Sequence, residues 1–144
     1  MGKVSVDSIV VTPLKQIYAL GGDVMHAMKC SDTGFVDFGE AYFSKVQAGA
    51  VKGWKKHLRM TLNLIVPIGT VRFVFIDDNG GLREELIGEN SYVRLTVPPG
   101  IWFGFEGKEK LFSLILNIAD IQHTPDEVER KCLEEINFEW GLTK

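Results

Sequence analysis

Residues 49–63 read Gly49-Ala50-Val51-Lys52-Gly53-Trp54-Lys55-Lys56-His57-Leu58-Arg59-Met60-Thr61-Leu62-Asn63. In an extended strand, successive side chains point to opposite faces of the sheet. The stretch is therefore predicted to form a strand with one polar face, which carries Lys55, His57, Arg59, Thr61 and Asn63. The opposite face is apolar and carries Met60, Leu62, Leu64 and Val66.

The polar face of this strand has two interpretations. Nitrogen-bearing side chains at positions i, i+2 and i+4 make a row of hydrogen-bond donors suited to an anionic or carbonyl-bearing ligand. Alternatively, charged side chains protect an exposed edge strand from pairing with other chains. The strand alone does not separate a ligand site from a solvated edge.

The rest of the chain predicts an all-β fold. Short apolar runs recur between Gly, Pro, Asn and Asp residues, and about nine short strands at this spacing are typical of an antiparallel sandwich or barrel. Asp77-Asp78-Asn79-Gly80-Gly81 is a strong hairpin turn. The candidate strands span residues 8–12, 24–29, 39–46, 58–66, 71–77, 83–87, 92–97, 101–105 and 111–119.

The C-terminal part of the chain changes character. Thr124 is placed as an N-cap, Pro125 follows at the first helical position, and Glu127 is placed for a capping box. Val128, Cys132, Leu133 and Ile136 share a helical stripe. We therefore expect one domain over residues 1–144 that ends in a helix at about residues 125–137.

Composition excludes several classes of protein. A chain of 144 residues is long enough to bury a core without metals or disulfides. The net charge of -3 gives no support to nucleic-acid binding. Cys30 and Cys132 lie far apart, which favours free thiols. No apolar run is long enough to span a membrane and the N-terminus lacks a signal sequence, so a cytoplasmic protein without a membrane partner is expected.

The glycine-framed strand and the Pro98-Pro99-Gly100 corner resemble the double-stranded β-helix (jelly roll) of the cupin superfamily. Metal-binding cupins have Gly, five residues and His-x-His in a first motif and Pro-x-Gly-x-x-His in a second. The ligand positions of these motifs fall here on Lys55, His57, Thr61 or Leu62, and Phe103. His57 alone can bind a metal, and because a metal site needs three or four ligands, no metal is expected.

Within the cupins, the chain resembles dTDP-4-dehydrorhamnose 3,5-epimerase. The Gly-x-x-Arg-Gly-x-His-x-Gln motif of that family corresponds to Gly49, Lys52, Gly53, Lys55 and His57, and its Ile-Pro-Pro-Gly-x-x-His-Gly-Phe corner corresponds to residues 97–105. The resemblance implies a metal-independent, cofactor-free epimerase or isomerase that acts on a 4-keto-6-deoxy nucleotide-sugar, in deoxysugar and polysaccharide biosynthesis. It also implies a homodimer, with which the apolar face of Met60, Leu62 and Leu64 is compatible if that face is not internal.

Several positions depart from the epimerase pattern. The catalytic His of the family falls on Lys55, its tyrosine acid falls on Leu116, and the acidic partner of its His has no evident counterpart. The phosphate-binding Arg falls on Lys52, which keeps the charge but loses bidentate geometry.

The remaining side chains suggest the chemistry of proton transfer beside a ketone, which needs a base and a group that stabilises an enolate. His57 is the candidate general base or acid, since imidazole titrates nearest to neutral pH. Lys55 is a candidate enolate stabiliser, or a base if burial and Arg59 lower its pKa. Tyr42 is a candidate proton donor.

Other side chains are candidates for binding the substrate, each with a structural alternative. Lys52 and Arg59 are expected to bind a diphosphate or carboxylate, as is Arg72 unless it lies on an outer rim. His26 lies in an apolar stretch, where a partly buried structural histidine is the simpler interpretation. The complete candidate substrate-binding set is Lys52, Arg59, Arg72, Asn63 and His26.

A second function stays open from the sequence. A cupin without catalysis that binds a nucleotide-sugar or another small anion also fits the clustered nitrogens, and the missing tyrosine and histidine of the epimerases favour it.

Overall fold

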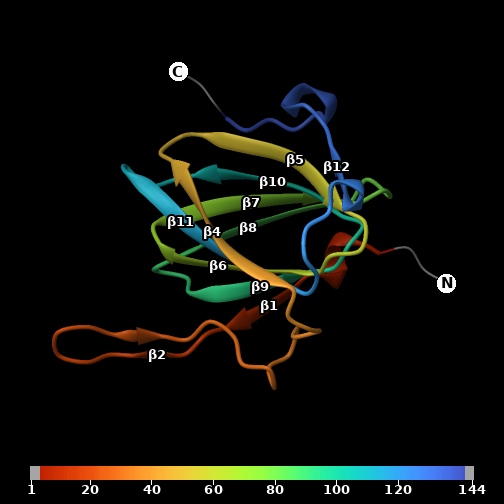
Figure 1. The fold of residues 1–144 in the computed structure, drawn as a ribbon. Coiled ribbons are helices and arrows are strands. Elements are labelled where there is room, and N and C mark those ends of the chain that lie inside the picture. The colour runs from red at the N-terminus through yellow and green to blue at the C-terminus, as the bar shows by residue number, and fades with distance from the viewer. Residues whose placement is uncertain (1–3, 142–144) are drawn as a thin grey trace.

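The computed structural model describes residues 4–141 and consists almost entirely of β-strands, as the sequence predicts (Figure 1). Two five-stranded antiparallel sheets lie face to face. The first contains, in spatial order, β1 (Val10–Pro13), β9 (Val93–Val97), β6 (Leu62–Ile68), β11 (Phe112–Ala119) and β4 (Glu40–Gln47). The second contains β12 (Val128–Arg130), β5 (Val51–His57), β10 (Trp102–Gly107), β7 (Thr70–Ile76) and β8 (Leu82–Gly88). A small hairpin of β2 (Gln16–Ile17) and β3 (Val24–Met25) projects from the body.

The hydrophobic core fills the space between the two sheets. Alternate residues of each strand point inward, so that Phe73 and Phe75 of β7 meet Leu62 and Leu64 of β6, all at most 3% exposed. Burying each such side chain stabilises the fold by roughly 1.5–3 kcal/mol. This packing fixes which face of each strand is internal.

The turn at Asp77–Gly81 forms the hairpin between β7 and β8, as predicted. One carboxylate oxygen of Asp77 accepts hydrogen bonds from the N–H groups of Asn79 and Gly81, and the other accepts one from Val6. The bonds from Val6 and Gly81 hold the pKa of Asp77 below its usual value, against the opposing effect of burial. The turn therefore also fixes the single-turn helix η1 (Val6–Ser8).

Residues 49–63 do not form one strand, and here the prediction was wrong. β5 ends at His57 and β6 begins at Leu62, because the chain crosses from one sheet to the other in between. The crossing makes both His57 and Leu62 internal, and Met60, Leu62 and Leu64 belong to the core. The apolar face of this stretch is therefore not free to form a dimer.

The expected C-terminal helix at about residues 125–137 was also wrong. Two single-turn helices, η2 (Pro125–Glu127) and η3 (Leu133–Glu135), flank the short strand β12. β12 pairs with β5, so that Val128 lies opposite His57 and Arg130 opposite Lys55. Pairing with the edge of the sheet satisfies the backbone groups that a helix would have bonded internally. In residues 4–141, no helix is long and apolar enough to span a membrane.

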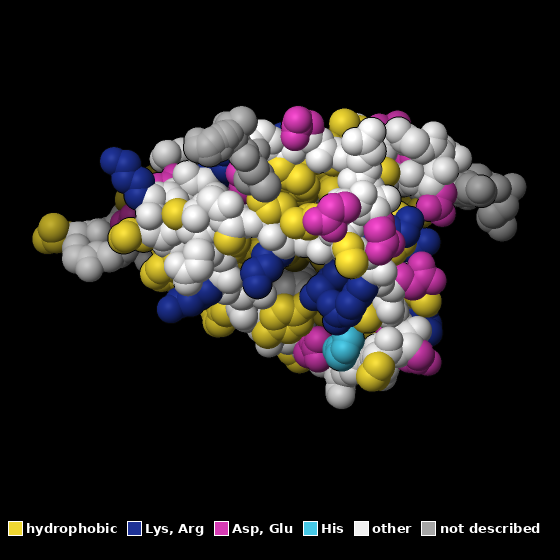
Figure 2. Space-filling view, turned by 90° about the horizontal axis from the view of Figure 1, so that it is seen from above, with side chains coloured by type: hydrophobic (Ala, Val, Ile, Leu, Met, Phe, Trp, Pro, Cys, Tyr) yellow, Lys and Arg dark blue, Asp and Glu magenta, His cyan; other side chains and the backbone are white. Residues whose placement is uncertain are grey.

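The last residues of the described chain cover the outer face of the second sheet. Trp140 and Phe138 pack on Trp54, with ring centroids 5.4 and 6.3 Å away. Trp102 belongs to the same cluster. From above, Figure 2 shows hydrophobic side chains still visible among charged ones on this side of the molecule.

Candidate functional site

A bulge in β5 brings two lysines to the inner face of the sheet. Lys55 lies opposite Phe103 of β10, whereas Lys52 lies opposite Phe105, so two residues of β5 face the single residue Gly104. Without the bulge, side chains three positions apart would point to opposite faces. A Cβ at Gly104 would lie 3.0 Å from the carbonyl oxygen of Lys52, so the close approach of the two strands here favours glycine.

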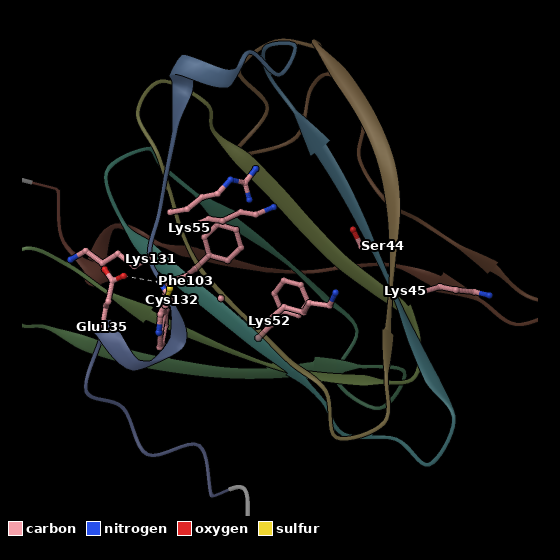
Figure 3. A pocket seen from close by; sticks show the side chains of 12 residues that line it. Ser44, Lys45, Lys52, Lys55, Phe103, Lys131, Cys132 and Glu135 are labelled. Atoms are coloured by element: carbon pink, nitrogen blue, oxygen red, sulfur yellow. Dashed lines mark hydrogen bonds between the residues drawn. The ribbon is translucent and has the colours of Figure 1, made fainter.

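The two lysines open onto a cavity of about 730 Å³. Its wall comes from β4, β5, β10, β12 and the segment that follows β12. Figure 3 shows Lys55 and Phe103 on neighbouring strands, with Ser44 on the facing strand β4. The lining residues are Ser44, Lys45, Lys52, Gly53, Trp54, Lys55, Phe103, Phe105, Arg130, Lys131, Cys132 and Glu135.

Three of the five basic residues in this wall are placed to meet a ligand. Lys45 points away from the cavity and lies 4.7 Å over the ring of Phe112 (Figure 3). Lys131 lies 4.6 Å over the ring of Trp102, on the outer face of the sheet. The remaining three, Lys52, Lys55 and Arg130, lie on the inner face. They place positive charge beside the rings of Phe103 and Phe105.

His57 lies beside the cavity and is held by a buried carboxylate. Its Nδ1 lies 2.8 Å from Oε1 of Glu127, which is fully buried. The second oxygen of Glu127 accepts hydrogen bonds from the N–H groups of Leu58, Arg59 and Met60 at 3.1, 3.1 and 2.9 Å. The imidazole also stacks on Phe103 of the cavity wall, with ring centroids 6.1 Å apart.

This arrangement orients His57. Burial would raise the pKa of Glu127, but the hydrogen bonds from His57 and from the N–H groups of Arg59 and Met60 outweigh it and hold the pKa below its usual value. An ionised carboxylate only accepts hydrogen bonds, so Nδ1 carries the hydrogen of a neutral imidazole. Nε2, to which no residue of 4–141 forms a hydrogen bond, is then the basic nitrogen.

The ammonium group of Lys55 lies in an unfavourable environment for its charge. Burial lowers the pKa of Lys55, and the neighbouring cations Arg130 and Lys52 lower it further. The pKa of Lys55 is therefore lowered, as expected from the sequence, but the cations responsible are Arg130 and Lys52 and not Arg59. Within residues 4–141, no carboxylate forms an ion pair with Lys55.

Tyr42 lies on the inner face of β4, two residues before Ser44. Its hydroxyl accepts a hydrogen bond of 3.0 Å from the side-chain amide of Asn117, directly opposite on β11. The side chain of Tyr42 is 42% exposed, and because its oxygen accepts this bond, its own hydrogen is left to be donated. Oδ1 of Asn117 is buried without a partner among the described residues.

Of the eight predicted site residues, Lys52 and Lys55 line the cavity, and besides His57 and Tyr42 four more lie outside it. Arg59 is exposed and contacts Thr124 and Asp126. Arg72 lies on the outer face of its sheet. Asn63 is buried on the outer face of β6, where it donates to the carbonyl of Gly34 and accepts from Thr96. His26 borders a separate hollow of about 350 Å³ with Lys15, Lys29 and Arg94.

The contacts of Arg72 explain its position. Its guanidinium binds Glu84 at 2.8 Å, Glu106 at 3.2 Å and the carbonyl of Trp140 at 3.1 Å. It also lies 5.2 Å from the ring centre of Phe138. Arg72 therefore attaches the C-terminal segment to the sheet.

The sequence interpretation missed Glu127 and Arg130. Both lie where a helix was expected, so Glu127 was assigned to a helix cap. The pattern Val128-Glu129-Arg130 is equally an alternation, and as a strand it places Val128 and Arg130 on one face. That alternation was the available signal for Arg130, whereas the pairing of Glu127 with His57 depends on the tertiary fold.

The arrangement of donor groups does not suggest a metal site. Among residues 4–141, no three His, Cys, Asp or Glu side chains are close enough together to hold a metal ion. At His57, Nδ1 is already engaged by Glu127. The cavity wall instead carries three inward-facing cations together with Ser44, Cys132 and Glu135, and an oriented imidazole lies beside it, which suits anion binding and proton transfer.

No protein-family profile matches the chain. No curated protein sequence matches it either. Solved structures do match. A dTDP-sugar isomerase from Desulfovibrio desulfuricans is 34% identical, over 96% of this chain and 94% of that one, with a TM-score of 0.91.

Two more distant structures share the fold. A sugar 3,4-ketoisomerase from Thermoanaerobacterium thermosaccharolyticum, solved in complex with TDP, is 17% identical over 88% of this chain and 90% of that one, with a TM-score of 0.76. A dTDP-4-dehydrorhamnose 3,5-epimerase from Sulfolobus tokodaii is 17% identical over 93% and 82%, with a TM-score of 0.80. On the identity with the Desulfovibrio protein, the chain belongs to the dTDP-sugar isomerase family, which has the cupin-type fold of these sugar-nucleotide isomerases and epimerases.

Proposed function

We propose that this protein is a metal-independent isomerase or epimerase that acts on a dTDP-linked 4-keto-6-deoxy sugar. The observation that carries the proposal is the buried Glu127–His57 pair beside a cation-lined cavity. Related solved structures support the substrate class: one ketoisomerase was crystallised with TDP-4-keto-6-deoxyglucose. The Glu127–His57 pair supplies the base that the reaction needs, and the cations supply the site for the anionic diphosphate.

In this proposal, Nε2 of His57 removes the proton from the carbon beside the ketone. Such a proton is acidic because the resulting electron pair is delocalised onto the carbonyl oxygen. Glu127 keeps the imidazole in the required tautomer and stabilises the imidazolium that forms, which is the role of a carboxylate behind a histidine base. Lys55 stabilises the oxygen that gains charge.

Lys52 and Arg130 are proposed to bind the diphosphate. Both lie on the inner face at the mouth of the cavity and are exposed to solvent. Arg130 replaces Arg59 in this role, since Arg59 lies with Asp126 outside the cavity. The aromatic rings of Phe103 and Phe105 offer apolar surface to the sugar or base.

Tyr42 is proposed to return the proton to the sugar. Its hydroxyl is oriented by Asn117 on the sheet that faces His57. Proton removal on one face and return from the other inverts a carbon centre, whereas return by His57 itself favours transfer within one face. The relative use of His57 and Tyr42 would then decide between isomerisation and epimerisation.

We also propose that the protein forms a homodimer in the cytoplasm. Val36, Phe38 and Phe43 are 61–64% exposed at and before β4, and such apolar surface is a common part of subunit interfaces. Cys30 and Cys132 are free and exposed thiols, which fit a reducing compartment. Sedimentation equilibrium tests the dimer, with Phe43→Lys as the variant expected to dissociate it.

The reaction is tested by incubating the protein with TDP-4-keto-6-deoxyglucose in deuterated water and following C3, C4 and C5 by NMR. Loss of the C3 proton with deuterium gained at C4 of a 3-keto sugar identifies a ketoisomerase, and exchange with inversion at C3 or C5 identifies an epimerase. His57→Gln should slow exchange at least about 100-fold. Tight binding without exchange above the enzyme-free control would instead identify a binding protein.

A further inference from the structure

Lys55 differs from the other lysines of the cavity wall in its surroundings. Lys45 and Lys131 lie over aromatic rings and point away from the cavity. Lys52 is exposed at the mouth. Lys55 is half-buried on the inner face between Lys52 and Arg130, so cations surround it where a lysine usually has an acidic partner.

This environment favours the neutral, nucleophilic form of the Lys55 amine. Burial, Arg130 and Lys52 all lower the pKa of Lys55, which increases the fraction of neutral amine. A buried lysine beside another cation is one of the known ways in which an enzyme prepares an amine to attack a carbonyl group. The ligand proposed for this cavity carries such a carbonyl.

We propose that Lys55 forms a Schiff base with the ketone of the sugar, which replaces the role of oxygen-stabilising cation given to it above; the inference otherwise rests on the proposed function. The nitrogen lone pair attacks the carbonyl carbon to give a carbinolamine, which loses water to give a C=N bond. The iminium nitrogen is positively charged and withdraws electrons from the neighbouring C–H bond. The iminium group therefore stabilises the electron pair left by proton removal, as an external acid stabilises an enolate.

His57 is placed to complete this step. Two residues along the same face of a strand have Cα atoms about 7 Å apart, so His57 and Lys55 border the same part of the inner face. Nε2 of His57 takes the proton, the C–H electron pair forms a C=C bond, and the C=N pair moves onto nitrogen to give an enamine. Return of a proton to carbon regenerates the iminium, and water then releases the ketone and the free amine.

The experiment is reductive trapping. The protein is incubated with TDP-4-keto-6-deoxyglucose and sodium cyanoborohydride, which reduces an iminium in preference to a ketone. Intact-mass spectrometry should then show an increase by the mass of the sugar nucleotide less one oxygen atom, and peptide mapping should place it on Lys55. Lys55→Arg keeps the charge and should give no adduct. Lys56→Arg is the matched control, since the side chain of Lys56 lies on the outer face with Glu129 and should leave trapping unchanged.

Each outcome decides between the two proposals. An adduct on Lys55 supports the Schiff base. No adduct, or an adduct that maps to Lys52, overturns it, whatever the exchange result. Deuterium exchange without an adduct leaves the proposed isomerase intact and returns Lys55 to the role of a cation. An adduct without exchange keeps the Schiff base and contradicts the isomerase.

Discussion

Oε1 of Glu127 lies 2.8 Å from Nδ1 of His57, although 70 positions separate the two residues in the chain. The other oxygen of the same carboxylate binds the backbone at the point where the chain leaves β5 for the opposite sheet. One side chain therefore orients the imidazole and fixes the crossing between the sheets. Its removal should affect stability and activity together.

Glu127→Gln should lower the free energy of unfolding at pH 7 by roughly 1–3 kcal/mol, because a neutral amide cannot accept all of these hydrogen bonds and places a donor against N–H groups. Urea denaturation measures the change. Glu129→Gln is the control, since Glu129 lies two positions further along, is half-exposed and forms an ion pair with Lys56. Equal effects of the two substitutions would contradict the anchoring role of Glu127.

The same carboxylate predicts an acid dependence. Its pKa is lower in the folded state than the usual value, so its contribution to stability is complete above about pH 5 and is lost as the pH falls through the folded pKa. The stability difference between the wild type and Glu127→Gln should therefore shrink as the pH is lowered below about 4. Denaturation midpoints measured from pH 7 to pH 3 would show the two proteins converging, and parallel curves would argue against the assignment.

Arg130→Met should change the pH dependence of catalysis. Removing one cation beside Lys55 raises the pKa of Lys55 toward its ordinary value, so less of the amine is neutral at a given pH. The rise of kcat with increasing pH should therefore shift to higher pH. KM should also increase, because a proposed contact with the diphosphate is lost. Lys131→Met is the control, because the ammonium group of this neighbouring residue lies over Trp102 on the outer face of the sheet. An unchanged pH profile of kcat would show that Arg130 does not influence the amine of Lys55.

Arg72→Met separates a binding role from a structural one. Arg72 joins Glu84, Glu106 and the carbonyl of Trp140, and its loss leaves the 5%-exposed Glu106 without its shorter ion pair. We expect the free energy of unfolding to fall by roughly 1–3 kcal/mol. The KM for the nucleotide-sugar should stay within a factor of about two, since Arg72 does not line the cavity. A large rise in KM with unchanged stability would restore the substrate-binding interpretation.

Tyr42→Phe tests proton return. The ring and its packing are kept, and the hydroxyl that Asn117 orients is lost. If Tyr42 donates the proton, turnover should fall about 100-fold, while proton removal by His57 continues. NMR in deuterated water should then show formation of inverted product slowed more than exchange at the same carbon. Equal slowing of both processes would assign Tyr42 to substrate positioning.

Local patterns in the sequence predicted the all-β architecture, the Asp77–Gly81 hairpin and a strand that carries Lys52, Lys55 and His57. These features depend on alternation and on turn chemistry, which are visible within a few residues. The strand break after His57 was not predictable in this way, because polar and apolar residues continue to alternate through Leu58–Thr61. The break depends on a carboxylate that is supplied from another part of the chain.

The error at the C-terminus and the alternatives left open at Arg72 have a related cause. Thr124-Pro125-Asp126-Glu127 satisfies the rules for a helix start, but the edge of β5 offers a strand partner that those rules do not consider. Arg72 shares its face with Val74, and only the structure shows that this face is covered by Trp140. In both cases the deciding contact is made by residues distant in sequence.

Because β12 comes last of the strands in the chain, the candidate site is completed late in synthesis. Synthesis runs from the N-terminus, and every strand except β12 is complete once Ala119 has been added. A ribosome therefore produces nearly the whole of both sheets before it adds Glu127 and Arg130. Until that moment the nascent chain lacks the carboxylate that orients His57 and the third cation of the inner face, so the chemistry of this protein is among the last of its properties to arise.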